Sequence, residues 1–267
     1  MNRTELISQI RAKKSFLCVG LDTDPNLLPK HLSKDAAGVL AFNKAIIEAT
    51  SDLAVSYKVN TAFCEAMGKT GWEILHETFK LIPKSCLSIA DAKRGDIGNT
   101  SNQYARAFFD EMDADALTLA PYMGLDSIQP FMGRKEKWGI VLGLTSNPGS
   151  ADFEQQRLES GEFMYERVIS TFGKAFSADE LMFVIGATKP EQFKSIRGIV
   201  PNHFFLVPGV GAQGGSLSEV CKFGLTDDIG LLINSSRGII YASSEMDFAE
   251  RARAEALKLQ KEMESYL

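Results

Sequence analysis

The residues from 91 to 100, DAKRGDIGNT, hold the densest set of side chains in this chain that could do chemistry. They follow a short apolar segment, 87–90, and if that segment is a β-strand its period of two places Asp91 and Lys93 on the same face. Asp96 follows in a turn flanked by glycines, where a free backbone can direct a third charge towards the first two or towards a neighbouring molecule. Mixed charges at this spacing suit a charge relay, although a surface salt-bridge turn would have the same residues.

The composition is that of an ordinary globular protein. The chain has 267 residues, 45% hydrophobic and 24% charged, a length that suits one large barrel or two modest domains. Its net charge is -5 and it has no run rich in Lys and Arg, so we expect no nucleic-acid partner. Its N-terminus is polar, and no apolar stretch approaches ~18 residues. We therefore expect neither a signal peptide nor a membrane span, and a cytoplasmic protein.

Cysteine and histidine do not form a recognisable metal site. The four cysteines are widely scattered and include no CxxC pair: Cys18, Cys64, Cys86 and Cys221. We expect buried free thiols rather than a disulfide framework or a zinc site. The three histidines are also dispersed, so the sequence predicts no metal.

The elements that must position the charges alternate between strand-like and helical segments. Eight apolar runs are expected to be strands: 16–21, 54–59, 87–92, 116–120, 139–144, 181–187, 204–207 and 230–233. The segments between them have helical periodicity, as in the stripe that includes Leu75 and Phe79. Ser33 is expected to cap the helix that carries Val39, Leu40, Ile46 and Ile47. Eight β-then-α units in this length predict a single (β/α)8 TIM barrel over residues 1–267, with a short N-terminal helix and a C-terminal helix.

A doubly wound parallel sheet is the alternative fold. Such a sheet usually has a glycine-rich nucleotide loop after its first strand, but here that position has the sequence GLDTDPN. No linker or low-complexity stretch divides the chain, and its least regular part, 146–161, is expected to be a long loop. The barrel is therefore the favoured fold.

In a TIM barrel, chemistry takes place where the strands end and the βα loops begin. The first expected strand ends at Asp22, the second near Lys58, and the third at Asp91 and Lys93. Asp and Lys are rarely buried without partners, so these four predict a network in which they satisfy one another and hold a proton on a lysine. A decarboxylase without a cofactor needs such a network. A purely structural ion-pair network is the alternative.

The loops after the seventh and eighth expected strands indicate a phosphate site. The seventh strand is followed by PGVGAQGG at 208–215, whose backbone N–H groups could face an anion, and the eighth by Arg237 and Gly238. Gln213 and Arg237 would supply side-chain donors. A glycine-rich loop by itself is as often a tight turn, and the arginine on the adjacent strand strengthens the interpretation. Ser146, after the fifth strand, could bind a polar ring edge or belong to a plain turn.

Together, DAKRGDIGNT, the GLD at 20–22, Lys58, PGVGAQGG and NSSRG resemble the orotidine 5′-phosphate decarboxylase family. The form DAKRGDIG with TSNPG is similar to its longer bacterial subgroup, and the resemblance runs in the expected order from about Phe16 to Gly238. It implies decarboxylation of orotidine 5′-monophosphate to uridine 5′-monophosphate, the last step of de novo pyrimidine biosynthesis, with no cofactor and no metal.

The resemblance also implies a role for each candidate residue. Lys93 would protonate the ring carbon, Asp91 would lie beside the departing carboxylate and orient Lys93, and Lys58 and Asp96 would complete the network. The substrate-binding residues would be Asp22, Lys58 and Thr100 for the ribose hydroxyls, Ser146 for the pyrimidine amide, and Gln213 and Arg237, beside Gly238, for the phosphate. Asp96 and Thr100 would enter the neighbouring subunit's site, which implies a homodimer.

Two other functions fit these motifs. A magnesium-dependent sugar-phosphate decarboxylase or synthase of the same superfamily would share the charged strand and the phosphate loops, and its sensitivity to chelator would distinguish it. A phosphate-binding barrel without chemistry is the non-enzymatic alternative. Such a protein would have no need to keep Lys58, Asp91, Lys93 and Asp96 together.

Overall fold

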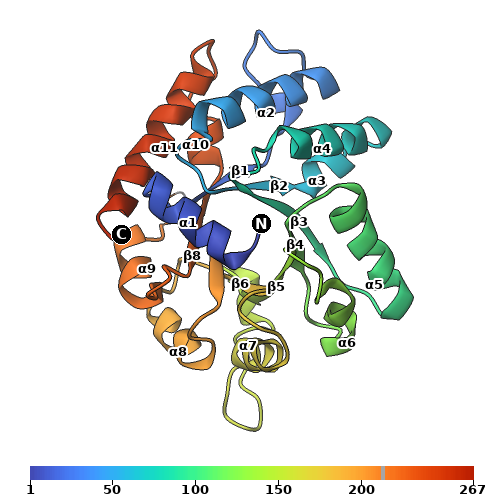
Figure 1. Ribbon diagram of the computed structural model, residues 1–267, viewed down its shortest axis with the longest axis vertical. Helices are drawn as coiled ribbons and strands as arrows, with labels where there is room; N and C mark the ends of the chain where they lie inside the picture. Colours follow the sequence, from blue (N-terminus) through green and yellow to red (C-terminus); the bar gives the residue numbers. More distant parts are fainter. Residues whose placement is uncertain (212–213) are drawn as a thin grey trace.

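The fold is a closed barrel of parallel strands surrounded by helices (Figure 1). The computed structural model describes residues 1–211 and 214–267. Each strand pairs in parallel with the next one along the chain, and the last pairs with the first through Ile233 and Leu17. The predicted (β/α)8 barrel is therefore confirmed, and an open doubly wound sheet is excluded because the first and last strands are joined.

The strands are short apolar segments, buried on both faces because helices cover the outside of the barrel and side chains fill its inside. Their bounds are Leu17–Leu21 (β1), Ser56–Asn60 (β2), Leu87–Arg94 (β3), Ala116–Leu119 (β4), Trp138–Leu144 (β5), Leu181–Ile185 (β6), Phe204–Pro208 (β7) and Leu231–Ser235 (β8). All eight expected runs are strands. The ladders of β2 and β8 continue past the apolar runs, so the polar residues Asn60, Asn234 and Ser235 belong to the strand ends.

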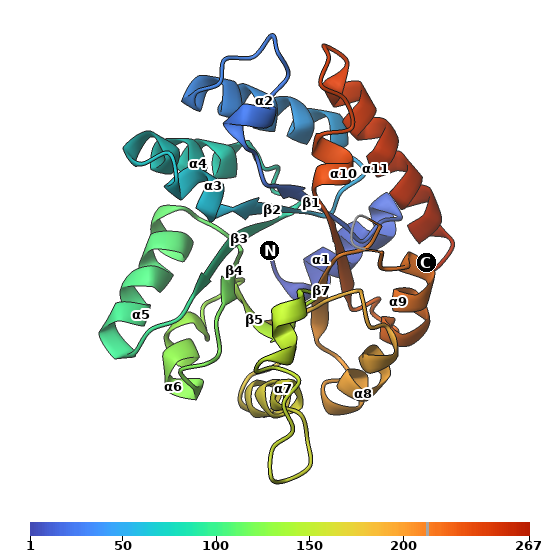
Figure 2. The ribbon, with the colours of Figure 1, turned by 180° about the vertical axis from the view of Figure 1, so that it is seen from behind.

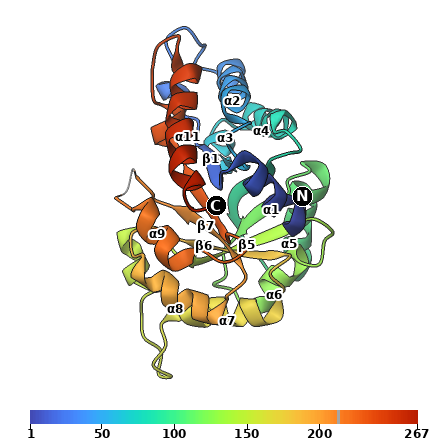
Figure 3. The same cartoon turned by 60° about the vertical axis from the view of Figure 1, so that its left-hand side comes forward.

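The helices form a ring around the barrel, except for α1, which crosses its amino end (Figure 1). Their bounds are Arg3–Lys13 (α1), Ala36–Thr50 (α2), Thr61–Glu65 (α3), Lys69–Leu81 (α4), Gly98–Ala105 (α5), Leu125–Ile128 (α6), Met164–Ala175 (α7), Glu191–Ile199 (α8), Leu217–Gly224 (α9), Arg237–Ile240 (α10) and Phe248–Glu264 (α11). The C-terminal helix α11 packs along α2, so the two ends of the helical ring meet (Figure 3).

The segment between β5 and α7 contains the expected long loop. It includes a 3-10 turn, Pro148–Ala151, and an isolated antiparallel bridge between Arg157 and Phe163. The loop projects away from the barrel beside α7 (Figure 2). Its first residues, by contrast, lie at the end of β5 and face the interior described below.

The cap of α2 differs from the prediction. Asp35, not Ser33, is the N-cap residue, and its carboxylate accepts a hydrogen bond from the Gly38 backbone N–H at 3.1 Å. The Ser33 hydroxyl donates instead to the Asp35 carboxylate at 2.7 Å. The prediction of Ser33 is wrong because Asp caps as well as Ser, and a carboxylate gains further from the positive end of the helix dipole.

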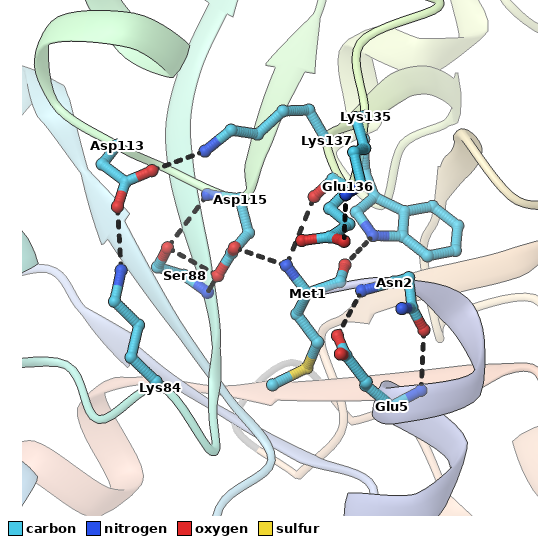
Figure 4. A network of polar contacts seen from close by, with 11 residues as sticks. Met1, Asn2, Glu5, Lys84, Ser88, Asp113, Asp115, Lys135, Glu136 and Lys137 are labelled. Atoms are coloured by element: carbon cyan, nitrogen blue, oxygen red, sulfur yellow. Dashed lines mark hydrogen bonds and ion pairs between the residues drawn. The ribbon is translucent and has the colours of Figure 1, made fainter.

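A polar network closes the amino end of the barrel (Figure 4). Asp115, just before β4, accepts hydrogen bonds from the N–H and the hydroxyl of Ser88 on β3, each at 2.9 Å. Its other carboxylate oxygen lies 2.8 Å from the amino group of Met1. The Trp138 indole N–H donates to the Met1 carbonyl at 2.8 Å. Both oxygens of Asp115 are therefore used within the protein.

The cysteines are buried free thiols, as predicted. Burial raises the pKa of Cys18 to about 12, although Ser56 and Lys58 act in the opposite direction. A thiol with such a pKa is protonated and unreactive at neutral pH. Across the described residues, none of the helices combines the length and the apolar character needed to cross a bilayer.

Candidate active site

A cavity of about 360 Å³ opens at the carboxyl end of the barrel. One half of its wall is polar and charged and comes from the β1 to β4 side: Asp22, Lys58, Asp91, Lys93 and Thr118. In the other half, Leu142, Val184 and Leu206 from β5, β6 and β7 form an apolar surface, and polar residues that follow β5 and end β8 complete the wall. The cavity can therefore hold a flat ring with one face on apolar side chains and an edge beside a cluster of charges.

The charged half contains a row of alternating acids and bases. The Lys58 ammonium lies 3.4 Å from Asp22 Oδ1 and 3.0 Å from Asp91 Oδ2. The Lys93 ammonium lies 2.7 Å from Asp91 Oδ1. Lys58 and Asp91 are only 5% and 9% exposed, and charges at that depth need partners. The four residues predicted from the strand ends thus lie together and pair with one another.

Pairing fixes the charge state of the two buried members. Burial by itself would raise the pKa of Asp91, but Lys58 and Lys93 outweigh burial and lower that pKa to about 2. Burial would lower the pKa of Lys58, but Asp91 and Asp22 more than offset it and raise that pKa above its ordinary value. Asp91 is therefore a carboxylate and Lys58 an ammonium ion at neutral pH.

Lys93 differs from Lys58 in its exposure and in its backbone. Its side chain is 51% exposed, against 7% for Lys58, and it lines the cavity. Its φ angle is 48°, in the left-handed region that residues other than glycine rarely adopt. Both lysines line the cavity, and Lys93 is the more exposed of the two to a bound molecule.

A bulge in β3 brings Asp91 and Lys93 together. Ala90 pairs with Leu117 and then Arg94 pairs with Leu119, so β3 has extra residues between two pairs that are close on β4. The two charges do meet, as predicted, but simple strand periodicity is not the reason. The bulge and the left-handed backbone direct the second side chain back to the first.

Sequence reasoning missed Thr118, which lies on β4 and is 1% exposed. Its hydroxyl oxygen accepts a hydrogen bond from the Lys93 backbone N–H at 2.9 Å and donates to Asp91 Oδ1 at 2.9 Å. The available signal was a single hydroxyl in the apolar run 116–119, opposite the charged strand. A buried threonine in a strand is common enough that this signal indicates nothing by itself.

Of the remaining binding residues predicted within one chain, Ser146 and Arg237 are at the cavity wall. Ser146 follows β5 and Arg237 is the first residue of α10, and both line the cavity. Gly238 follows Arg237 and is exposed. The β7 loop contributes Pro208, Gly209 and Val210 to the wall, but Gln213 lies outside the described residues.

Two contacts hold the segment 145–147 at the cavity wall. A Cβ atom at Gly186, just after β6, would lie 2.8 Å from the backbone nitrogen of Ser146, so only glycine fits there. On the other side, the Glu154 carboxylate accepts the backbone N–H of Thr145 at 2.7 Å and its hydroxyl at 2.9 Å. Ser146 is therefore fixed by its neighbours and not only by the strand.

Asp96 and Thr100 are not among the described residues that line this cavity. Asp96 lies in the turn between β3 and α5, where its carboxylate accepts the Ile97 N–H at 2.8 Å, and Thr100 is exposed on α5. Large apolar side chains are exposed nearby, with Ile97 at 59% and Tyr122, on the loop after β4, at 90%. The predicted network of four catalytic residues is thus present in one chain only as Lys58, Asp91 and Lys93.

The arrangement can stabilise negative charge that develops beside Lys93 and can deliver a proton to it. Asp91, held by two lysines and a hydroxyl, fixes the position of the Lys93 ammonium, and a fixed cation in a partly buried cavity stabilises an anion better than a mobile one does. Among residues 1–211 and 214–267, no three His, Cys, Asp or Glu side chains form a group that could hold a metal ion.

Comparison with known proteins identifies similar chains over the full length. A family model described as orotidine 5′-phosphate decarboxylase / HUMPS family matches residues 15–252. The orotidine 5′-phosphate decarboxylase of Bacteroides fragilis is 51% identical and covers 100% of this chain and 98% of its own. That of Flavobacterium johnsoniae is 54% identical, over 98% and 97%. The structure of Leishmania donovani OMP decarboxylase has a TM-score of 0.85 at 37% identity, over 100% of this chain and 98% of that one.

Proposed function

This chain belongs to the orotidine 5′-phosphate decarboxylase family and is a carboxy-lyase of pyrimidine biosynthesis, and we propose that it acts through a cofactor-free Asp/Lys charge network. The observation that carries the proposal is the 2.7 Å pair between Lys93 and Asp91 at the cavity, backed by the buried Lys58. The reaction converts orotidine 5′-monophosphate to uridine 5′-monophosphate. The cytoplasmic location expected from the sequence stays a prediction.

The proposed chemical step needs only a fixed cation. The bond between the ring carbon and the carboxylate breaks, carbon dioxide leaves, and the electron pair stays on the ring carbon, where no carbonyl can delocalise it. The Lys93 ammonium stabilises this pair as it forms and then donates a proton to it. Lys93 is left neutral and regains a proton from solvent, so the net reaction consumes one proton.

The other residues are proposed to orient the substrate. Asp91 lies beside the departing carboxylate and holds Lys93, while Lys58 and Asp22 bind ribose hydroxyls. Ser146 binds the pyrimidine amide, with the ring against the apolar half of the cavity. Arg237, together with Gln213 and the backbone near Gly238, binds the phosphate, because a guanidinium matches phosphate geometry with two parallel hydrogen bonds. Binding energy from the phosphate then positions the ring for the chemical step.

The test is to follow the absorbance of orotidine 5′-monophosphate with purified protein in excess chelator. We expect full activity, and we expect the same rate when the chelator has been saturated with magnesium beforehand. Loss of activity in chelator and recovery with magnesium would favour the magnesium-dependent members of the superfamily. No turnover under either condition, with phosphate ligands still bound, would favour a barrel without chemistry.

We also propose a homodimer in which Asp96 and Thr100 complete the partner's site. Two observations support it: neither residue lines the cavity of its own chain, and exposed apolar side chains, Ile97 and Tyr122, lie on the adjoining loops. A surface of this kind is suited to pairing with a second copy about a two-fold axis, which repeats each contact on both subunits. A carboxylate from the partner would extend the row of alternating charges beyond Lys93.

Mixing two inactive variants tests the shared site. Subunits of Lys93→Ala and Asp96→Ala are allowed to exchange, and exchange is verified by native mass spectrometry. If sites are shared, a mixed dimer has one site with both lesions and one intact site, so random pairing restores about a quarter of all sites. If Asp96 serves its own chain, every site keeps one lesion. Verified exchange without recovered activity would therefore remove Asp96 from the partner's site.

A further inference from the structure

We propose that Thr118 is a positioning residue that holds Lys93 in its reactive conformation. The inference rests on the proposed function, because it assigns Thr118 a role through Lys93. Thr118 comes from β4, whereas the charges that it contacts come from β3, so it acts across the two strands at the point where their regular pairing is interrupted.

The backbone of Lys93 requires an external constraint. Its φ angle of 48° is unfavourable for a residue with a side chain, and such conformations persist when surrounding contacts hold them. The interruption of the ladder between Ala90 and Arg94 leaves the intervening residues without regular partners on β4. The Lys93 N–H donates to the hydroxyl oxygen of Thr118 at 2.9 Å. The side chain of Thr118 thus holds the Lys93 backbone where the regular pairing between β3 and β4 is interrupted.

The same hydroxyl also sets the acceptor of the Lys93 ammonium. It donates to Asp91 Oδ1 at 2.9 Å, and that oxygen lies 2.7 Å from Lys93 Nζ. One hydroxyl therefore fixes both ends of Lys93, the backbone by accepting a hydrogen bond and the side chain through Asp91. Thr118 is 1% exposed, so water cannot easily replace it.

The other anchor of the bulge does not duplicate these contacts. Arg94 donates to the Ala92 carbonyl at 2.8 Å, forms an ion pair with Glu65, and lies over the Tyr104 ring. These contacts fix the exit of the bulge. Among the described residues, only Thr118 forms hydrogen bonds with both the Lys93 backbone and the Asp91 carboxylate.

Two pairs of variants isolate the hydroxyl. Thr118→Val keeps the shape and removes the hydroxyl, while Thr118→Ser keeps the hydroxyl and Thr118→Ala removes it from the smaller side chain. We expect Thr118→Val and Thr118→Ala to lower kcat by about 10²-fold, the scale for a misplaced catalytic group, and Thr118→Ser to stay within about fivefold. KM should change by less than about threefold in all of them, because the substrate contacts remain. The Ala variant, which adds no methyl group against Asp91, keeps the comparison available if the Val variant does not fold.

Thr78→Val is the matched control, because Thr78 is also fully buried and its hydroxyl oxygen accepts the Asn43 amide at 3.1 Å, on α4 away from the cavity. This control variant should lose stability without a change in kcat.

Crystal structures of wild type and of the Thr118→Val or Thr118→Ala variant provide a readout independent of turnover. In the variant we expect Lys93 to leave its left-handed conformation or its contact with Asp91. A folded variant without the hydroxyl that keeps wild-type kcat and an unchanged Lys93 would overturn the proposal. Absence of turnover in wild type would refute the proposed function instead, and the crystal structures would still decide the role of Thr118.

Discussion

Strands β3 and β4 carry a hydroxyl and a carboxylate at each of their two ends, in opposite order. At the amino end the hydroxyl is Ser88 on β3 and the carboxylate is Asp115, just before β4, with 2.9 Å between them. At the carboxyl end the carboxylate is Asp91 on β3 and the hydroxyl is Thr118 on β4, also 2.9 Å apart. The local chemistry of the two pairs is therefore the same.

The two ends differ in the groups that make the remaining contacts of each carboxylate. Asp115 is completed by the amino group of Met1, which also donates to the Glu136 carbonyl at 3.3 Å, so the contacts of that network lie within the protein (Figure 4). Asp91 is completed by two lysines, and one of them, Lys93, is 51% exposed at a cavity. The same pair of groups thus supports stability at one end and presents a cation to a ligand at the other. What separates the two is the half-exposed lysine at the carboxyl end, not the hydrogen bonds.

The largest effect is expected at the carboxyl end, from Lys93→Ala. This change removes both the proton donor and the fixed cation, so kcat for orotidine 5′-monophosphate should fall at least ~10⁴-fold. The free energy of unfolding should change by less than about 1 kcal/mol, because the lost ion pair is half-exposed. Steady-state kinetics and urea denaturation measure the two. A folded variant with a tenth of wild-type turnover would contradict the role of Lys93.

Arg237→Ala separates binding from chemistry within that end. Losing a charge-assisted contact to phosphate costs about 1.5–3 kcal/mol, so kcat/KM should fall by about 10- to 150-fold. With orotidine, which lacks the phosphate, variant and wild type should be about equally slow. Equal impairment of the variant on both substrates would show that Arg237 does not act through the phosphate.

Asp115→Asn tests the amino end. The amide cannot reproduce the charged hydrogen bonds to Ser88 and Met1, so the free energy of unfolding should fall by about 1.5–3 kcal/mol. Turnover of the folded fraction should stay within about twofold of wild type, because the network has no contact with the cavity. Asp113→Asn is the control, since that side chain is 64% exposed and its loss should cost less. A specific loss of kcat in Asp115→Asn would break the distinction between the two ends.

The smallest effect is an acid dependence that belongs to Asp91. Despite burial, Lys58 and Lys93 lower its pKa to about 2 from the ordinary 3.8, so its stabilisation is present above pH 3.8 and is lost as the pH falls towards 2. The difference in unfolding free energy between wild type and Asp91→Asn should shrink by about 2 kcal/mol over that interval. Urea denaturation at several pH values measures it. A difference that stays constant down to pH 2 would mean that the lysines do not hold Asp91 ionised.

The barrel was predictable because parallel strands that are buried on both faces appear in the sequence as short, nearly continuous apolar runs. The predictions were wrong where polar residues determine the ends of helices and strands. Asp35 caps α2 although Ser33 is an equally good cap by type. Strand β8 extends through Asn234 and Ser235 because Asn234 pairs with β7 and Ser235 with β1. Such boundaries depend on which donor meets which acceptor in space, which local sequence does not specify.

The site was predictable in part, and for a similar reason. The position of Asp22, Lys58, Asp91 and Lys93 at the ends of expected strands predicted that they lie together, because parallel strands in a barrel end at one rim. It could not reveal the bulge that turns Lys93 back, nor the hydroxyl of Thr118, since both depend on pairing between strands. The roles proposed for Asp96 and Thr100 require a second subunit, and they stay predictions.

The close approach at Gly186 has a consequence for how this protein tolerates change. Its missing side chain leaves room for the backbone of Ser146, so every replacement at that position would push the cavity wall, although the glycine has no group that could bind a substrate. In a saturation library selected for growth without added uracil, Gly186 should therefore be as invariant as the charged residues. A map of the positions that tolerate no substitution would then include residues that make space for the binding residues, and not only those that touch the ligand.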